Sequence, residues 1–130
     1  MNIYLSGQVF WSYDHEIEQT GLGQEIKALF SFTPPIHHHS GIISLTEHQL
    51  VIEGDLNLPI PLSDITQIYL GFDEIFKRTY VKNGGMFWQP LRLIYNSGFR
   101  SATIYLIIDH NAFGAKNTLW FNTLKQLLSE

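Results

Sequence analysis

Apolar and polar residues alternate with a period of two through the middle of the chain, from residue 25 to residue 109. Such alternation predicts β-strands that bury one face and expose the other. Turn-forming residues interrupt it at short intervals, among them Pro34-Pro35, Gly54-Asp55 and Asn83-Gly84-Gly85. The pattern predicts strands over residues 26–33, 41–45, 49–53, 56–60, 62–70, 86–96 and 102–109.

The period of the apolar residues changes near residue 114. Trp120, Leu124, Leu127 and Leu128 follow one another at helical spacing, which gives the apolar stripe of an amphipathic helix. We expect a helix over 115–129. At about 1.5 Å per residue this helix is about 20 Å long, enough to cover one open end of a small barrel.

The first 24 residues stand apart from this pattern. A strand-like stretch over 3–11 leads into polar Asp14-His15-Glu16 and then into Gly21-Leu22-Gly23. We interpret residues 1–24 as an added strand or arm and residues 25–130 as the domain proper. The whole forms one globular domain, because 130 residues is an ordinary length for a single domain.

Charge and cysteine content narrow the function classes. Eight Lys and Arg against 12 Asp and Glu give a net charge of −4, opposite to the balance of proteins that bind a phosphate backbone, so we expect no nucleic-acid partner. Cysteine is absent, which excludes thiol nucleophiles, disulfides and Fe–S clusters. The sequence has no basic region typical of a signal peptide and no run near the about 20 apolar residues of a transmembrane helix. We expect a cytoplasmic protein without a transmembrane segment.

Residues 41–54 (GIISLTEHQLVIEG) and 58–68 (LPIPLSDITQI) carry a family resemblance. They resemble the hairpin, short strand and Ile-Pro-Leu-x-Asp-Ile run of bacterial pleckstrin-homology-like (PH-like) and GRAM-type domains. About seven strands followed by one C-terminal helix is also the element order of that family. The resemblance implies a mainly β fold, a half-open barrel of two nearly orthogonal antiparallel sheets capped by the C-terminal α-helix. It also implies a non-catalytic module that binds phosphoinositides, peptides or folded partners.

The chemistry of phosphoinositide binding is missing from the loop that would hold the ligand. Recognition of an inositol phosphate needs Lys and Arg side chains. Residues 32–40 contain neither, and Lys27 lies back on the predicted strand. We therefore do not expect a phosphoinositide ligand, and weak binding of anionic lipid is the least favoured alternative.

Three consecutive histidines, His37-His38-His39, are the clearest candidate ligand site. Alternate residues of an extended chain point the same way, so His37 and His39 could chelate one metal ion. The pair resembles the His-x-His part of the cupin metal motif, but Ile43 and Ser44 occupy the positions of the required carboxylate. A third ligand could be one of the remaining histidines, His15, His48 and His110. A small-ligand or metal-binding barrel with this segment at its mouth is one alternative, and a polar solvated loop is the simpler interpretation.

Aromatic and basic residues gather between the predicted strands at 62–70 and 86–96. Exposed aromatic residues are typical of binding surfaces, and the cations could attract an acidic partner. The candidate partner-binding residues are Phe72, Phe76, Lys77, Arg78, Tyr80, Lys82, Phe87 and Trp88. The alternative is that the aromatic residues line the core and that Asp73 and Glu74 cancel the positive field.

No motif in the sequence supports catalysis. It has no Gly-x-Ser-x-Gly nucleophile elbow, no phosphate-binding loop and no His-Glu-x-x-His. We therefore expect no enzyme activity and no cofactor. The favoured function is binding of a protein or peptide, by strand addition at an open sheet edge or through the 72–88 segment, with a homodimer through the N-terminal strand as a further alternative. A barrel interior filled by apolar side chains favours this function over a ligand-binding barrel, and the residues expected to fill it are Phe30, Leu45, Ile52, Leu93 and Ile107.

Overall fold

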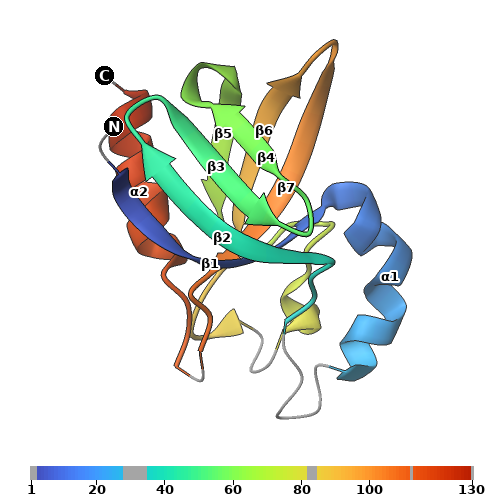
Figure 1. Ribbon diagram of the computed structural model, residues 1–130. Coiled ribbons are helices and arrows are strands. Elements are labelled where there is room, and N and C mark those ends of the chain that lie inside the picture. The colour runs from blue at the N-terminus through green and yellow to red at the C-terminus, as the bar shows by residue number, and fades with distance from the viewer. Residues whose placement is uncertain (1–2, 28–34, 82–84, 112, 130) are drawn as a thin grey trace.

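The computed structural model describes residues 3–27, 35–81, 85–111 and 113–129. The chain is mainly β, with seven antiparallel strands in one open sheet and a C-terminal α-helix (Figure 1). The strands are β1 (Ile3–Tyr13), β2 (His39–Thr46), β3 (Gln49–Gly54), β4 (Leu58–Pro61), β5 (Ile65–Leu70), β6 (Leu91–Ser97) and β7 (Arg100–Ile108). The helices are α1 (Asp14–Lys27) and α2 (Asn117–Leu128), with short 3-10 turns η1 (Leu62–Asp64) and η2 (Arg78–Tyr80).

β1 lies at the centre of the sheet, whose strand order is β4-β3-β2-β1-β7-β6-β5. Val9 of β1 has a partner on each side, Gly41 of β2 and Ile108 of β7. The two halves of the fold are therefore continuous through β1, and the two separate sheets expected from the sequence are joined into one. Residues 1–24 were interpreted as an added strand or arm. Residues 3–13 form the strand that joins the halves, and residues 14–24 belong to α1.

Most of the period-two stretches form the strands they predict. The stretches at 41–45, 49–53, 56–60 and 102–109 correspond to β2, β3, β4 and β7, and 62–70 forms η1 followed by β5. The strand predicted at 86–96 begins only at Leu91, because Pro90 has no N–H for the ladder and its carbonyl instead accepts the N–H of Gly71. The strand predicted at 26–33 is wrong at residues 26–27, which end α1, and residues 28–33 and the turn at 83–84 lie outside the described residues.

The helix α1 was not predicted, although its first turn carries a helix-start signal. The backbone N–H of Tyr13 donates to Glu16 Oε1 at 2.8 Å, which satisfies a group that the helix leaves unpaired. Asp14 and Glu16 also place negative charge at the positive end of the helix. α1 and α2 lie at opposite ends of β1 (Figure 1).

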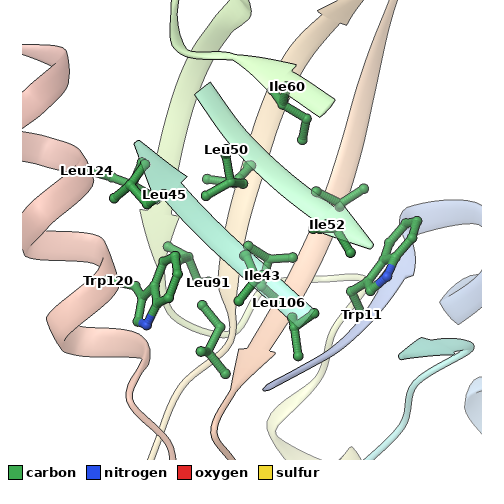
Figure 2. Packing of buried hydrophobic residues seen from close by; sticks show 14 of the residues in the cluster. Trp11, Ile43, Leu45, Leu50, Ile52, Ile60, Leu91, Leu106, Trp120 and Leu124 are labelled. Atoms are coloured by element: carbon green, nitrogen blue, oxygen red, sulfur yellow. The ribbon is translucent and has the colours of Figure 1, made fainter. Parts of the chain in front are cut away.

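The main core lies between the strands and α2 (Figure 2). Alternate strand residues point inward, so Ile43 of β2 and Leu50 of β3 are fully buried. Trp120 and Leu124 of α2 complete this cluster, which confirms the helical stripe predicted from their spacing. The expected interior residues that lie in this core are Leu45, Ile52 and Leu93.

A second, smaller cluster packs on the opposite face of β1 and β7, where α1 covers it. Side chains alternate along a strand, so Leu106 points into the main core while Tyr105 and Ile107 belong to this second cluster. Ile17 of α1 is fully buried there. Ile107 was expected in the barrel interior and lies here instead, and Phe30 lies outside the described residues.

Candidate functional site

The sheet ends in two edge strands with different chemistry. β4 has four residues, two of which are Pro59 and Pro61, and proline removes the N–H donors that a further strand would need. β5 has six residues and no proline, and within the sheet it pairs with β6 alone. β5 is therefore the edge that can accept another strand.

A groove of about 510 Å³ lies beside β5 and the C-terminal half of α2. Its apolar lining includes Ile65, Ile68 and Leu128, which also pack against the main core. Thr66 is exposed at the irregularity in the β5–β6 register. The described lining residues include one ionisable side chain, that of Lys125. The full lining is Leu62, Ser63, Ile65, Thr66, Gln67, Ile68, Lys125, Leu128 and Ser129.

The aromatic residues predicted to bind a partner mostly lie in the second core cluster. Phe76 and Tyr80 are buried, and Phe72 and Trp88 are half-buried against them. The Phe76 ring centre lies 6.0 Å from that of Phe72 and 6.3 Å from that of Trp88. Of this aromatic group only Phe87 is largely exposed, at 59%. The expectation of an aromatic patch on the surface is therefore corrected to a packed cluster.

The basic residues of the same segment lie over this aromatic cluster. The Arg78 guanidinium is 4.9 Å from the Phe72 ring centre, and Lys77 Nζ is 5.9 Å from that of Tyr80. Both cations are exposed, so they contribute contacts at the rim of the cluster. Lys82 lies outside the described residues.

Asp73, which the sequence suggested only as a neutralising charge, is the centre of a hydrogen-bond network. Its carboxylate accepts bonds from Arg92 Nη1 at 3.0 Å, from the Tyr105 hydroxyl at 2.7 Å and from the N–H groups of Ile75 and Phe76. Burial alone would raise the pKa of Asp73, but these bonds outweigh it and hold the pKa below its ordinary value. Burial, followed by the bond to Asp73, raises the pKa of Tyr105. A pocket of about 340 Å³ opens here, lined by Asp14, Asp73, Glu74, Ile75, Arg92, Ile94, Thr103 and Tyr105.

Replacing Asp73 with asparagine is expected to change how the free energy of unfolding depends on pH in the acid range. Because the pKa of Asp73 is lower in the folded chain, its ionised carboxylate stabilises the fold at pH values above 3.8, the pKa in the unfolded chain. This stabilisation is lost as pH falls through the pKa in the folded chain. Asp73→Asn removes this component and lowers the free energy of unfolding by about 1–2 kcal/mol near pH 7. Urea unfolding at a series of pH values from about 7 to about 2.5 measures both the loss of stability near pH 7 and the change in its pH dependence. Glu74→Gln, at the exposed neighbouring carboxylate, is the control, and parallel pH curves for wild type and Asp73→Asn would contradict the assignment.

The two histidines predicted to chelate a metal do not face the same way. His37 stacks on Phe10 with 4.1 Å between ring centres, and His39 lies 4.4 Å from Trp11. Phe10 and Trp11 are consecutive residues of a strand and point to opposite faces of the sheet. Bends at residues 36 and 38 break the extended geometry that the prediction assumed. The chelating pair is not formed, and the described residues contain no group of three His, Asp or Glu side chains suited to a metal ion.

His39 is held instead by two carboxylates that the sequence did not connect with it. Its Nδ1 lies 2.7 Å from Asp55 Oδ2, and its Nε2 lies 2.8 Å from Glu16 Oε2. The hydrogen bond from His39 lowers the pKa of Asp55. Glu16 lies in the first turn of α1 and Asp55 follows β3, so only the pairing of β1, β2 and β3 brings the three side chains together.

No protein-family model matches the chain, and no curated protein matches it. Neither helix in the described part of the chain combines the length and apolar character needed to cross a bilayer. The features from which a function can be inferred are therefore geometric: the free edge of β5 and the groove beside it.

Proposed function

We propose that this protein is a non-catalytic PH-like binding module that takes a segment of a protein or peptide partner as an added strand on β5. The proposal rests on the edge of β5, which contains no proline, pairs with β6 on one side only within the sheet and lies next to a groove of about 510 Å³. In strand addition, main-chain hydrogen bonds supply affinity and a neighbouring groove accepts alternate side chains of the ligand. The apolar lining and Lys125 favour a segment with apolar side chains and an acidic residue.

The order of the elements supports the PH-like part of the proposal. Residues 41–54 form the β2–β3 hairpin, and residues 58–68 form β4, the η1 corner and the start of β5, as the resemblance implies. The C-terminal helix packs against β5, β6 and β7. The chain departs from the expected order in one described place, where α1 lies between β1 and β2.

The filled interior supports a binding module over a ligand-binding barrel. Leu45, Ile52 and Leu93 are fully buried in a continuous apolar cluster. A ligand-binding barrel needs a lined cavity at that place. The groove beside α2 is instead on the outside of the core, where a partner segment can reach it.

Thr66→Pro is expected to weaken binding of a peptide at least about tenfold, which corresponds to about 1.4 kcal/mol. Thr66 lies on the edge strand at a register irregularity, a place where proline is tolerated while it blocks an added strand. The probe is a peptide selected on the full chain from a random peptide library. Fluorescence anisotropy gives its Kd for each variant, and circular dichroism verifies the fold.

Charge reversal at Lys77 and Arg78 serves as the matched control. The double variant Lys77→Glu/Arg78→Glu changes exposed residues away from the groove and is expected to leave the Kd unchanged. If the charge reversal abolishes binding and Thr66→Pro does not, the partner uses the 72–88 segment and the β5 proposal is wrong. Leu128→Glu, on the other wall of the groove, provides a second test that does not alter the backbone of β5.

A further inference from the structure

α1 and the segment before β2 cover an apolar patch on the outer face of β1 and β7. Ile17 of α1 and Ile36 of the segment are buried in the second cluster, against Tyr105 and Ile107 of β7. Both covering pieces belong to the connection between β1 and β2. The groups that hold this connection on the sheet therefore help to keep the patch covered, together with Phe76, Tyr80 and Val81 of the same cluster.

His39 holds the connection through both of its ring nitrogens. Its two ring nitrogens lie 2.7–2.9 Å from carboxylate oxygens of Asp55 and Glu16, and its side chain is only 13% exposed. Carboxylates accept hydrogen bonds, so each ring nitrogen of His39 faces an acceptor. Glu16 also accepts the N–H of Tyr13 at the start of α1, so His39 ties the helix start to β2 and to the turn after β3.

The adjacent His38 holds the same connection as a neutral ring. The buried Ser12 hydroxyl accepts the backbone N–H of His38 at 2.9 Å and lies 2.8 Å from His38 Nδ1. Among the described residues, Nδ1 is the group within hydrogen-bond distance that can accept the single proton of that hydroxyl. The opposite nitrogen, Nε2, faces Thr20 Oγ1 of α1 at 3.4 Å, and Thr20 donates to the Glu16 carbonyl. Every hydrogen bond is satisfied when Nδ1 is unprotonated and Nε2 donates.

We infer that His38 and His39 form a pH-operated latch: at neutral pH they hold α1 and residues 35–38 on the sheet, and protonation of His38 releases them and uncovers the apolar patch at Tyr105 and Ile107. A protonated Nδ1 cannot accept the Ser12 hydroxyl. Protonation also places a positive charge on a half-buried ring. This device is independent of the proposed binding at β5, which lies at the α2 side of the sheet.

The net shift of the His38 pKa is in the direction that the latch requires. Burial is the largest cause that lowers its pKa, Glu16 opposes this, and His39, His37 and His15 add to the lowering. A histidine pKa that is lower in the folded than in the unfolded chain makes the stability of the fold depend on pH. The stabilisation is fully present above the pKa of 6.5 in the unfolded chain, and it is lost as pH falls through the pKa in the folded chain. Other titratable groups also face the latch. They are His37 of its own segment, His15 and Glu16 of α1, Tyr13 of β1, Asp55 in the turn after β3 and His110 after β7.

Hydrogen exchange of the full chain at about pH 7.5 and about pH 5.5, corrected for intrinsic rates, tests the latch. In wild type we expect amides of residues 14–20 and 36–38 to exchange several-fold faster at the lower pH, while those of β6 remain protected. His38→Asn keeps an acceptor oxygen near Ser12 without a titrating ring and is expected to keep both segments protected at both pH values. His48→Asn, at a largely exposed histidine in the β2–β3 turn, is the matched control and is expected to behave as wild type.

Three results would overturn the latch. The amides of α1 in wild type could be equally protected at the two pH values, or α1 of His38→Asn could exchange faster at the lower pH as wild type does. The third is that the amides of β6 exchange faster at the lower pH together with those of α1. Ser12→Ala provides a second test if His38→Asn fails to fold. Loss of the hydroxyl leaves Nδ1 without its donor, so the opening midpoint is expected to move to higher pH. An unchanged midpoint in Ser12→Ala would also contradict the latch.

Discussion

Trp120→Ala is expected to lower the free energy of unfolding by about 4 kcal/mol, the largest effect of any single substitution considered for this chain. The Trp120 side chain is 1% exposed and lies in the main core with Leu124 and the inward residues of β2 (Figure 2). Its removal leaves a cavity between α2 and the sheet that the surrounding strands can fill only in part. Denaturant unfolding followed by circular dichroism measures the change.

The exposed Leu119 provides the control for this prediction. Leu119 precedes Trp120 on α2 and is 50% exposed, so Leu119→Ala is expected to change stability by less than about 0.5 kcal/mol. Because α2 also forms one wall of the groove beside β5, Trp120→Ala should weaken peptide binding as well. A similar loss of stability in both variants would mean that Trp120 is not the residue that fixes α2 on the sheet.

Sequence alone predicted the elements whose two faces differ in burial. β2 alternates between exposed and buried positions from Ser40 to Leu45, because one face contacts the core and the other contacts solvent. α2 was predicted for the same reason, since Trp120 and Leu124 fall on one side of the helix. In both elements the spacing of the apolar residues follows from which side chains are buried.

α1 escaped prediction because its apolar residues form no stripe. Gly21 and Gly23 lie within the helix, and glycine disfavours helical conformation. The available signal was Glu16, three residues after Tyr13, whose carboxylate accepts the Tyr13 N–H at the helix start. The helix is retained by tertiary contacts with η2, β1 and β7, among which Ile17 is buried in the second cluster.

The site residues were less predictable than the strands because their partners are distant in sequence. His39 meets Glu16 across 23 positions and Asp55 across 16. Asp73 meets Tyr105 across 32. Such pairs follow from strand order, and residues 3–11 were interpreted as part of an added strand or arm rather than as the centre of the sheet. Once β1 is central, α1 must begin beside β2, and Glu16 comes within reach of His39.

The two ends of the central strand therefore carry different chemistry. At the end near α2, apolar and neutral polar side chains and one cation, Lys125, line the groove beside β5. At the end near α1, hydrogen-bonded histidines hold a cover over an apolar patch. Binding at the first end should be insensitive to the protonation of His38, so peptide affinity measured at two pH values separates the two proposals.

Asn117 illustrates how one buried polar residue fixes α2 in place. It is the first residue of the helix and is 1% exposed. Its Oδ1 accepts the N–H of Ile108 at 2.8 Å, and its Nδ2 donates to the carbonyls of Leu106 at 3.0 Å and Gln89 at 2.7 Å. One side chain thus joins the start of α2 to the end of β7 and to the segment before β6.

Asn117→Ala is expected to lower the free energy of unfolding by about 3 kcal/mol, because three backbone groups lose their partner and each buried unpaired group costs about 1–3 kcal/mol. Asn122→Ala, the same substitution at an exposed position of α2, is expected to cost less than about 0.5 kcal/mol. Urea unfolding measures both variants, and amide exchange at Ile108 reports the lost acceptor directly. Equal stability of the two variants would show that Ile108, Leu106 and Gln89 find other partners. The start of α2 would then be positioned by apolar contact alone.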